Sequence, residues 1–253
     1  MNEMQATIKK NSKNYSIDLS KPLDISMTLT ADAKNVNAWY IKAPKITPHT
    51  EGDFIGKVSE GSSTNFNDIW FNPHAHGTHT ECVGHITKEF YSVNQHLKQF
   101  FFLAEVITIA PEKLGEDFII SKKQLQYAIG NKKREAIVIR TIPNLSDKKS
   151  KQYSNTNPPY LTKDAALLLV QKGITHLLID LPSVDKEKDD GALVAHKAFW
   201  NFDGERRTNA TITEFIYVAN TIKDGTYFLN LQVAPFENDA SPSRPVLYAI
   251  SKE

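Results

Sequence analysis

Three apolar segments alternate with two helical segments between residues 101 and 180, and this alternation limits the folds open to the chain. Phe101–Ala110 is a nearly continuous apolar run, as expected of a strand that is covered on both faces. Ala136–Arg140 and Thr175–Asp180 are the other two apolar segments. Strands that alternate with helices pair in parallel through crossover connections. The sequence therefore predicts a βαβαβ core and an α/β fold.

Both intervening segments carry the terminal signals of helices. Ser121-Lys-Lys-Gln124 matches a capping box, in which a serine and a glutamine side chain bond reciprocally to the backbone of the first turn. This helix is expected to stop at Gly130, because glycine tolerates the left-handed conformation that ends many helices. A second helix is expected over residues 162–172, just before a glycine.

The flanks of this core are expected to be rich in strands. Two segments of alternating polar and apolar residues precede it, Met4–Ile8 and Tyr15–Leu19. A short helix and three extended segments are expected after it, over residues 192–201, 211–218, 226–233 and 245–251. The chain has no internal repeat and no linker rich in Gly, Pro or Ser. Residues 1–253 are therefore predicted to form a single domain with a β-rich N-terminal portion.

Charge and cysteine content exclude several classes of protein. Thirty Lys and Arg residues against 29 Asp and Glu leave a net charge of +1, so nucleic acid is not expected as a partner. No stretch approaches the roughly 18 apolar residues of a membrane span, so no membrane is expected either. The single cysteine, Cys82, cannot form an internal disulfide, which favours a cytoplasmic location. Charged clusters at residues 147–151 and 185–190 are expected on exposed loops.

Histidines gather in one short segment. Four of the eight in the chain fall between His74 and His85, in the run Pro-His-Ala-His-Gly-Thr-His-Thr-Glu-Cys-Val-Gly-His. Imidazole nitrogens and carboxylate oxygens are donors that suit Zn²⁺ and Mn²⁺. Because side chains alternate along an extended segment, His79, Glu81 and His85 are expected to share one face. The alternative, from these residues alone, is a solvent-facing loop that holds no metal.

Two distant residues favour the metal site. His196 has only apolar neighbours at helical spacing, so its imidazole is expected to point inward; a satisfied core histidine is the alternative. Glu214 lies between Ile212 and Ile216 at strand spacing, which places a carboxylate on an apolar face unless that face meets solvent. A buried carboxylate without a partner is costly. A metal shared with the histidine cluster accounts for both residues.

Six ordered segments resemble the cyclase or kynurenine formamidase family of metal-dependent hydrolases. Residues 75–85 resemble its signature His-x-Gly-Thr-His-x-Asp-x-Pro-x-His. The other segments follow in the family's order over residues 16–250: Asp24-Ile-Ser26, Leu178-Ile-Asp-Leu-Pro-Ser-Val-Asp185, Ala195-His196, Thr213-Glu214 and Asp239-Ala-Ser-Pro242 with Arg244. Trp39 lies where members carry a tryptophan that contacts substrate.

The resemblance implies a swivelling β/β/α domain that hydrolyses a C–N bond in a small aryl formamide or cyclic amide. A water activated by a divalent metal, Zn or Mn, is the expected nucleophile. The ligands that the resemblance implies are His79, Glu81, His196 and Glu214. His85 is expected to transfer a proton, since an imidazole titrates near neutrality. The family often dimerises, so a homodimer is also expected, whereas Cys82 is given no role.

The chain departs from the family signature at three positions. The first histidine of the signature falls on Ala75, its aspartate is Glu81 and its proline is Val83. Alanine cannot bind a metal, so the missing ligand has to come from His74 or His76, if it is replaced at all. Two further functions therefore stay open. One is a cyclic ester hydrolase or cyclase of the same family, and the other is a non-catalytic member that binds a small molecule.

Overall fold

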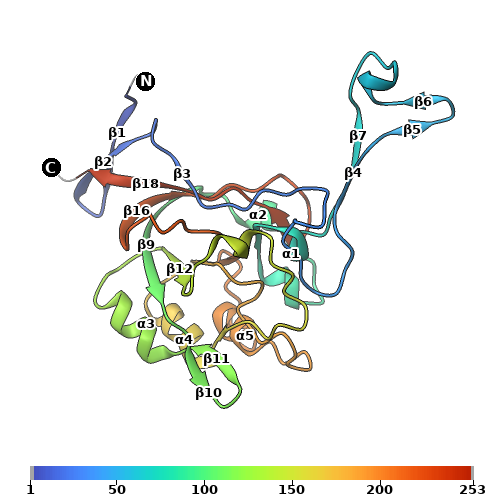
Figure 1. Ribbon diagram of the computed structural model, residues 1–253. Coiled ribbons are helices and arrows are strands. Elements are labelled where there is room, and N and C mark those ends of the chain that lie inside the picture. The colour runs from blue at the N-terminus through green and yellow to red at the C-terminus, as the bar shows by residue number, and fades with distance from the viewer. Residues whose placement is uncertain (1–2, 252–253) are drawn as a thin grey trace.

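One mixed sheet of eleven strands organises the chain (Figure 1), and the computed structural model describes residues 3–251. From one edge to the other, its strands are β1 (Gln5–Lys10), β2 (Lys13–Asp18), β18 (Val246–Ser251), β16 (Gly225–Asn230), β9 (Phe101–Ile109), β12 (Ala136–Thr141), β14 (His176–Ile179), β15 (Thr211–Glu214), β8 (His79–Glu81) and β17 (Ala240–Pro242). The short strand β3 (Leu23–Asp24) pairs with β18.

The four central strands are parallel, as the alternation of strands and helices predicts. β12 pairs in parallel with β9 and β14, and β14 pairs in parallel with β15. Val138 of β12 lies between Val106 and Leu178 of its neighbours, and all three side chains are fully buried. The apolar runs are therefore strands covered on both faces, and the mixed α/β class is confirmed.

Helices α3 (Lys122–Ile129), α4 (Lys163–Gln171) and α5 (Val194–Trp200) lie on one side of the sheet (Figure 1). Their apolar side chains pack with Ile137 and Ile139 of β12 in one hydrophobic core, while Val138 points into a second core on the opposite face. The capping box at Ser121 is present, and α3 ends before Gly130, whose φ is 56°. Local signals at both helix ends therefore predicted the element correctly.

An arm, residues 45–70, extends away from the sheet (Figure 1, upper right). Strands β4 (Lys45–Pro48) and β7 (Asn67–Trp70) form its stem, and β5 (Thr50–Glu51) and β6 (Phe54–Ile55) form the hairpin at its end, followed by the 3₁₀ turn η1 (Val58–Glu60). A separate three-stranded sheet joins β10 (Glu112–Leu114), β11 (Asp117–Ile120) and β13 (Tyr160–Leu161). Single turns α1 (Pro73–His76), η2 (Val83–Ile86), α2 (Val93–His96) and η3 (Ser146–Lys149) complete the described elements.

Three local predictions are wrong. The strand expected over residues 211–218 stops at Glu214, because Phe215 takes a left-handed φ of 54°. His85 lies on the 3₁₀ turn η2 and not on a continuous extended segment. The charged clusters are only partly exposed, since Lys148 donates to the Asp180 carboxylate in the interior and Asp185 is 2% exposed.

No helix in residues 3–251 has both the length and the apolar character needed to cross a bilayer. The prediction of one domain over residues 1–253 stays a prediction.

Candidate metal centre

Strand pairing brings three of the predicted ligands together. In the antiparallel register of β8 with β15, His79 lies directly opposite Glu214. Residues two apart on a strand share a face, so Glu81 lies on the same side of the sheet as His79. His79 Nε2 is 3.5 Å from Glu214 Oε2 and 3.9 Å from Glu81 Oε2. All three side chains are at most 5% exposed.

Helix α5 supplies the fourth predicted ligand. Its apolar face packs on the sheet, and the inward His196 places Nε2 at 3.1 Å from Glu81 Oε1 and 3.9 Å from Glu214 Oε1. Asp185 orients this imidazole, because its carboxylate is 2.6 Å from Nδ1 of His196 and accepts the backbone N–H groups of Ala195 and His196. The sequence thus predicted the direction of His196 correctly.

Two further imidazoles reach the same point. His74 on the turn α1 has Nδ1 at 3.1 Å from Glu81 Oε2, and His85 on η2 has Nε2 at 3.8 Å from the same oxygen. The two rings stack with centroids 4.3 Å apart, and Asp239 Oδ2 lies 3.0 Å from His74 Nε2 and 3.3 Å from His85 Nδ1. The absence of a side chain at Gly84 lets η2 pack closely against the backbone of Tyr91, because a Cβ at this position would collide with the Tyr91 carbonyl. His85 is the most exposed of these imidazoles, with 31% of its side chain accessible.

The four rings share one hydrogen-bonding pattern. In each, one nitrogen faces an oxygen outside the cluster centre: Gly77 O for His79, Asp185 for His196, and Asp239 for His74 and His85. An N–H donated to that oxygen leaves the lone pair of the other nitrogen directed at Glu81 or Glu214. This is the pattern of metal-binding histidines, whose second nitrogen bonds a carboxylate or a carbonyl.

The cluster comprises four imidazoles and four carboxylates: His74, His79, Glu81, His85, Asp185, His196, Glu214 and Asp239. Within residues 3–251 these carboxylates make ion pairs with histidines and with no lysine or arginine. In the same part of the chain, His79 Nε2 and Glu81 Oε2 are buried without a hydrogen bond. A buried lone pair facing a carboxylate is unfavourable unless a cation lies between them.

The electrostatic field of the cluster favours positive charge. Burial alone would lower the pKa of His74 and His196, but carboxylates outweigh it: Asp239 and Glu81 raise the pKa of His74 to about 10, and Asp185 and Glu81 raise that of His196 to about 10. Burial raises the pKa of Glu81, yet the surrounding imidazoles hold it well below its usual range. The same field would attract a divalent cation.

Donor spacing also fits a metal. The ligand atoms of His74, His79 and Glu81 lie within 4.8 Å of one another, as do those of Glu81, His85 and His196. Donors bound at 2.0–2.2 Å around a tetrahedral zinc ion are about 3.4 Å apart. The 3.1–3.9 Å separations around Glu81 bracket this value.

The cluster lies against a cavity of about 310 Å³. Trp39 forms part of its wall and also packs against a small apolar core, and its indole Nε1 donates to the carbonyl of His74 at 2.9 Å. The other lining residues are Ile41, Asn72, His74, Ala75, His85, Ser183, Leu193, His196 and Glu214. Trp39 therefore lies beside the cluster, and its contact with substrate stays a prediction.

The two histidines that flank Ala75 point in different directions. His74 faces Glu81, whereas His76 accepts the Asn72 N–H through Nδ1 and bonds the Lys42 carbonyl through Nε2. His76 is buried at the base of the arm, 5.7 Å from the Trp70 ring. Only His74 is therefore placed to replace the missing histidine.

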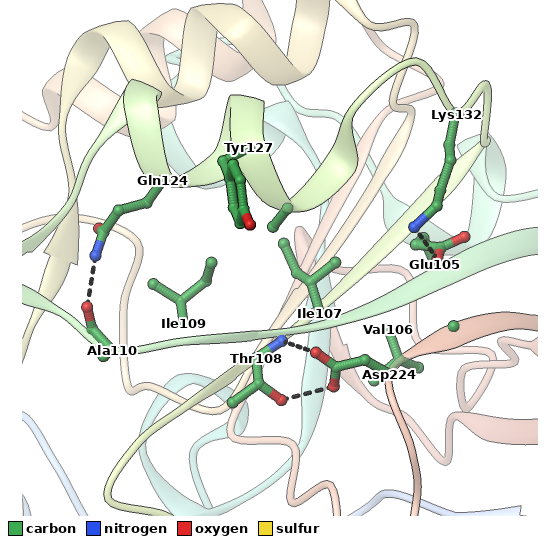
Figure 2. A pocket seen from close by; sticks show the side chains of 12 residues that line it. Glu105, Val106, Ile107, Thr108, Ile109, Ala110, Gln124, Tyr127, Lys132 and Asp224 are labelled. Atoms are coloured by element: carbon green, nitrogen blue, oxygen red, sulfur yellow. Dashed lines mark hydrogen bonds and ion pairs between the residues drawn. The ribbon is translucent and has the colours of Figure 1, made fainter.

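A second hollow, of about 390 Å³, lies between β9 and α3 (Figure 2). The polar side chains around it already have partners: Gln124 donates to the Ala110 carbonyl, Asp224 accepts from Thr108, and Lys132 pairs with Glu105. This β9–α3 hollow lacks the convergent imidazoles of the cluster, which makes it the weaker candidate for a reactive site.

Sequence reasoning missed two members of the cluster. Asp185 was expected on an exposed loop, and Asp239 was given no role. Both stand in segments that resemble the family, one at the end of the Asp-x-Pro-Ser-x-Asp segment and one at the start of Asp-Ala-Ser-Pro. Their place in these segments is the sequence signal that could have found them, although residue spacing alone does not connect them to the histidines.

Known proteins share this architecture. A solved structure described as a potential metal-dependent hydrolase with cyclase activity matches with a TM-score of 0.65 and 17% identity, over 90% of this chain and 97% of that chain. Isatin hydrolase A from Labrenzia aggregata, bound to benzyl benzoate, matches at 0.67 and 14%, over 91% and 94%. An isatin hydrolase bound to the product analogue thioisatinate matches at 0.64 and 16%, over 91% and 93%. No curated protein shows a significant match.

At these identities the structural matches establish the fold alone. The family model described as Putative cyclase matches residues 17–186, which is more than half of the chain. Together with the ordered segments of the sequence, this match identifies the chain as a member of the cyclase family.

Proposed function

We propose that the chain is a metal-dependent hydrolase that cleaves the C–N bond of a small aryl formamide or cyclic amide. The observation that carries the proposal is the convergence of four imidazoles and two buried glutamates beside a cavity, with no lysine or arginine paired to the glutamates within residues 3–251. Two structural neighbours named as isatin hydrolases support the substrate class, because isatin contains a cyclic amide.

We propose His79, Glu81, His196 and Glu214 as the residues that hold the metal, either Zn²⁺ or Mn²⁺. The unpartnered atoms His79 Nε2 and Glu81 Oε2 are the features that such an ion would satisfy. A bound divalent ion would supply a Lewis acid that polarises a carbonyl and acidifies a water molecule.

His74 completes the proposed set in place of Ala75. Its Nδ1 faces Glu81, and Asp239 fixes its other nitrogen. Replacing His74 with alanine is expected to weaken Zn²⁺ binding at least about 10-fold, whereas His76→Ala, at a neighbour that faces away, leaves it unchanged. Calorimetric titration of both metal-free variants provides the comparison. Equal affinities would refute the assignment of His74.

The remaining side chains have roles around the substrate. His85 lines the cavity and bonds Asp239 through Nδ1, so its Nε2 is placed to accept a proton from the attacking water and then to donate it to the leaving nitrogen. Trp39 offers a flat wall for an aromatic ring. Ser183 and Leu193 line the cavity beside them.

The decisive test is a screen of formylated anilines, lactams and lactones with Zn²⁺- or Mn²⁺-supplemented protein. Turnover of a formanilide or a lactam that is abolished by chelation is the expected result. Turnover of lactones alone would make the chain a cyclic ester hydrolase. Stoichiometric metal without turnover of any class, or no metal at all, would leave a binding protein and overturn the proposal.

We further propose that a second copy of the chain is the protein partner. The arm exposes more than a third of each of seven apolar side chains: Ile46, Phe54, Ile55, Val58, Phe66, Ile69 and Trp70. A standard interface buries roughly 800 Å² on each partner, and aromatic side chains such as those of Phe54, Phe66 and Trp70 are enriched at its core. Light scattering is expected to give a dimer that Ile69→Ser weakens, and a monomeric wild type at micromolar concentration would refute this.

The remaining partner and location assignments stay predictions. Absence of nucleic-acid binding rests on the balanced net charge of +1, and a filter-binding assay tests it. A cytoplasmic location rests on the single cysteine and is testable by cell fractionation.

A further inference from the structure

Two bulky residues that line the cavity have an unusual backbone conformation. Of the non-glycine residues with positive φ in the described chain, Trp39 and Leu193 line the cavity, and Tyr40 follows Trp39 directly. Bulky side chains rarely adopt this conformation. Such strain persists only where surrounding contacts hold it, and it is enriched at functional sites.

Trp39 and Tyr40 are consecutive, and both have a φ of 60°. Their side chains bond to different parts of the molecule. The Trp39 indole donates to the carbonyl of His74 at 2.9 Å and forms part of the cavity wall. The Tyr40 hydroxyl donates to Glu187 Oε1 at 2.6 Å, and its backbone N–H donates to Ser154 Oγ at 2.9 Å. Contacts made by Tyr40 therefore hold the backbone that presents Trp39.

Glu187 connects three loops. Besides the Tyr40 hydroxyl, its carboxylate accepts the backbone N–H groups of Asn155 at 2.5 Å and Asn157 at 3.0 Å. Two residues earlier in the same loop, Asp185 bonds the His196 imidazole. One short loop thus supports both the cavity wall and the cluster.

We propose that the Tyr40–Glu187 hydrogen bond is a latch that fixes the Trp39 indole as a rigid flat wall, so that the cavity selects substrates with a planar aromatic group. A surface that is already fixed stacks on an aromatic ring without a further entropic cost of ordering. Tyr40 and Glu187 are positioning residues, because they act through Trp39. The latch rests on geometry, while its effect on substrate choice rests on the proposed hydrolase function.

Acrylamide quenching of tryptophan fluorescence tests the latch without any substrate. In a Trp70→Phe background, Trp39 is the quenchable reporter, since Trp200 is fully buried. Tyr40→Phe removes only the hydroxyl and is expected to raise the quenching constant about twofold, as a part-buried indole becomes mobile. Glu187→Ala removes the acceptor altogether and is expected to act in the same direction, whereas glutamine would still offer an amide oxygen to the Tyr40 hydroxyl. Because Glu187 also accepts the backbone N–H groups of Asn155 and Asn157, the change at Glu187 is expected to have the larger effect, and the double variant should add little to it.

Tyr227→Phe is the control, since its hydroxyl donates to the Lys223 carbonyl at 2.8 Å and neither residue lines the cavity. This control is expected to leave quenching unchanged. A quenching constant in Tyr40→Phe that equals that of its parent would overturn the latch, whatever the activity of the protein.

The substrate arm compares N-phenylformamide with N-cyclohexylformamide, which has a non-planar ring. Tyr40→Phe is expected to raise KM for the aromatic amide about fivefold, with kcat, metal content and KM for the saturated amide nearly unchanged. Equal effects on both amides would overturn the selectivity while leaving the latch in place. Absence of turnover in the wild type would instead refute the proposed function, and the quenching result would still decide the latch.

Discussion

Glu105 and Glu81 are both buried almost completely, and they are neutralised in opposite ways. Glu105, beside the β9–α3 hollow, is 1% exposed and pairs with Lys132 at 2.8 Å and Arg134 at 3.0 Å. Thr226 also donates to its carboxylate. Glu81, in the cluster, is 0% exposed and has imidazoles around it, and its Oε2 has no hydrogen bond within the described residues. The chain supplies permanent positive charge to the first glutamate and not to the second.

This difference separates a structural carboxylate from a candidate ligand. Lysine and arginine stay charged at neutral pH, so the Glu105 network is complete in the folded chain. An imidazole binds either a proton or a metal ion through the same nitrogen, and the raised pKa values of His74 and His196 show that the field around Glu81 favours a bound cation, so the Glu81 network is complete only with added cations, either protons or a metal ion. Burial of charge alone would not have distinguished the two sites; the chemistry of the partners does.

The largest expected effect concerns proton transfer beside Glu81. His85→Ala is expected to lower kcat for N-phenylformamide by about 10²–10⁴-fold, because general acid–base catalysis contributes that much. Metal content and melting temperature should stay at wild-type values. Tyr127→Ala, an exposed change beside the β9–α3 hollow, serves as the control and should leave kcat unchanged. Loss of metal in His85→Ala would instead place His85 among the ligands.

Exchanging the two carboxylates for amides sharpens the contrast. Glu81→Gln is expected to weaken Zn²⁺ or Mn²⁺ binding by about 100-fold or more, since even residues that only orient ligands contribute 10–100-fold. Glu105→Gln should bind metal as the wild type does. Isothermal titration of the metal-free proteins measures both constants, and indistinguishable affinities would show that Glu81 is not a ligand.

The loss of folding stability is expected at Glu105 and not at Glu81. Glu105→Gln is expected to lower the free energy of unfolding by about 2–3 kcal/mol, because the partly buried Arg134 guanidinium loses the carboxylate that balances its charge. The partly exposed Lys132 adds little. Urea denaturation of the metal-free proteins gives the value, and a loss below about 0.5 kcal/mol would contradict the structural role assigned to Glu105.

A smaller effect is expected from the carboxylate behind His196. Asp185→Asn is expected to reduce metal affinity about 10–100-fold, because the imidazole loses the partner that fixes its tautomer. Asp224→Asn is the matched control, since that carboxylate pairs with Arg140 near the β9–α3 hollow. If both variants bound metal equally well, Asp185 would have no part in orienting the ligand.

The smallest effect is a pH dependence outside both regions. His176 is buried beside Phe102, and burial together with Arg207 lowers its pKa to about 3. The unfolded chain takes up this proton near pH 6.5 and the folded chain does not, so His176 reduces stability as pH falls below 6.5. His176→Phe should flatten the stability loss between pH 6 and 4.5 by about 1 kcal/mol per pH unit. If the free energies of unfolding of the two proteins, measured in urea, fell equally with decreasing pH, the lowered pKa of His176 would be contradicted.

Local patterns predicted the core elements, because their signals are complete within a few residues. The apolar run of β9 and the capping box at Ser121 are examples, and both elements form where they were expected. The inward direction of His196 was also readable from helical spacing. Each of these features depends on the periodicity of one element.

What the sequence missed depends on contacts between distant segments. His85 reaches Glu81 because η2 bends the chain at Gly84, where the backbone of Tyr91 passes close by. Asp185 is buried because α5 docks on the sheet above it, and Lys148 is buried because Asp180 lies at the end of β14. Charged runs look alike in a sequence whether they are solvated or paired, so only the folded arrangement separates the two cases.

Metal content after supplementation tests the central claim most directly. Wild type and Glu105→Gln, incubated with Zn²⁺ or Mn²⁺ and dialysed, are expected to retain at least one ion per chain by elemental analysis, and Glu81→Gln is expected to retain far less. Wild-type protein that emerges without metal, or a Glu81→Gln variant that retains as much metal as the wild type, would mean that no metal ion balances the negative charge of Glu81.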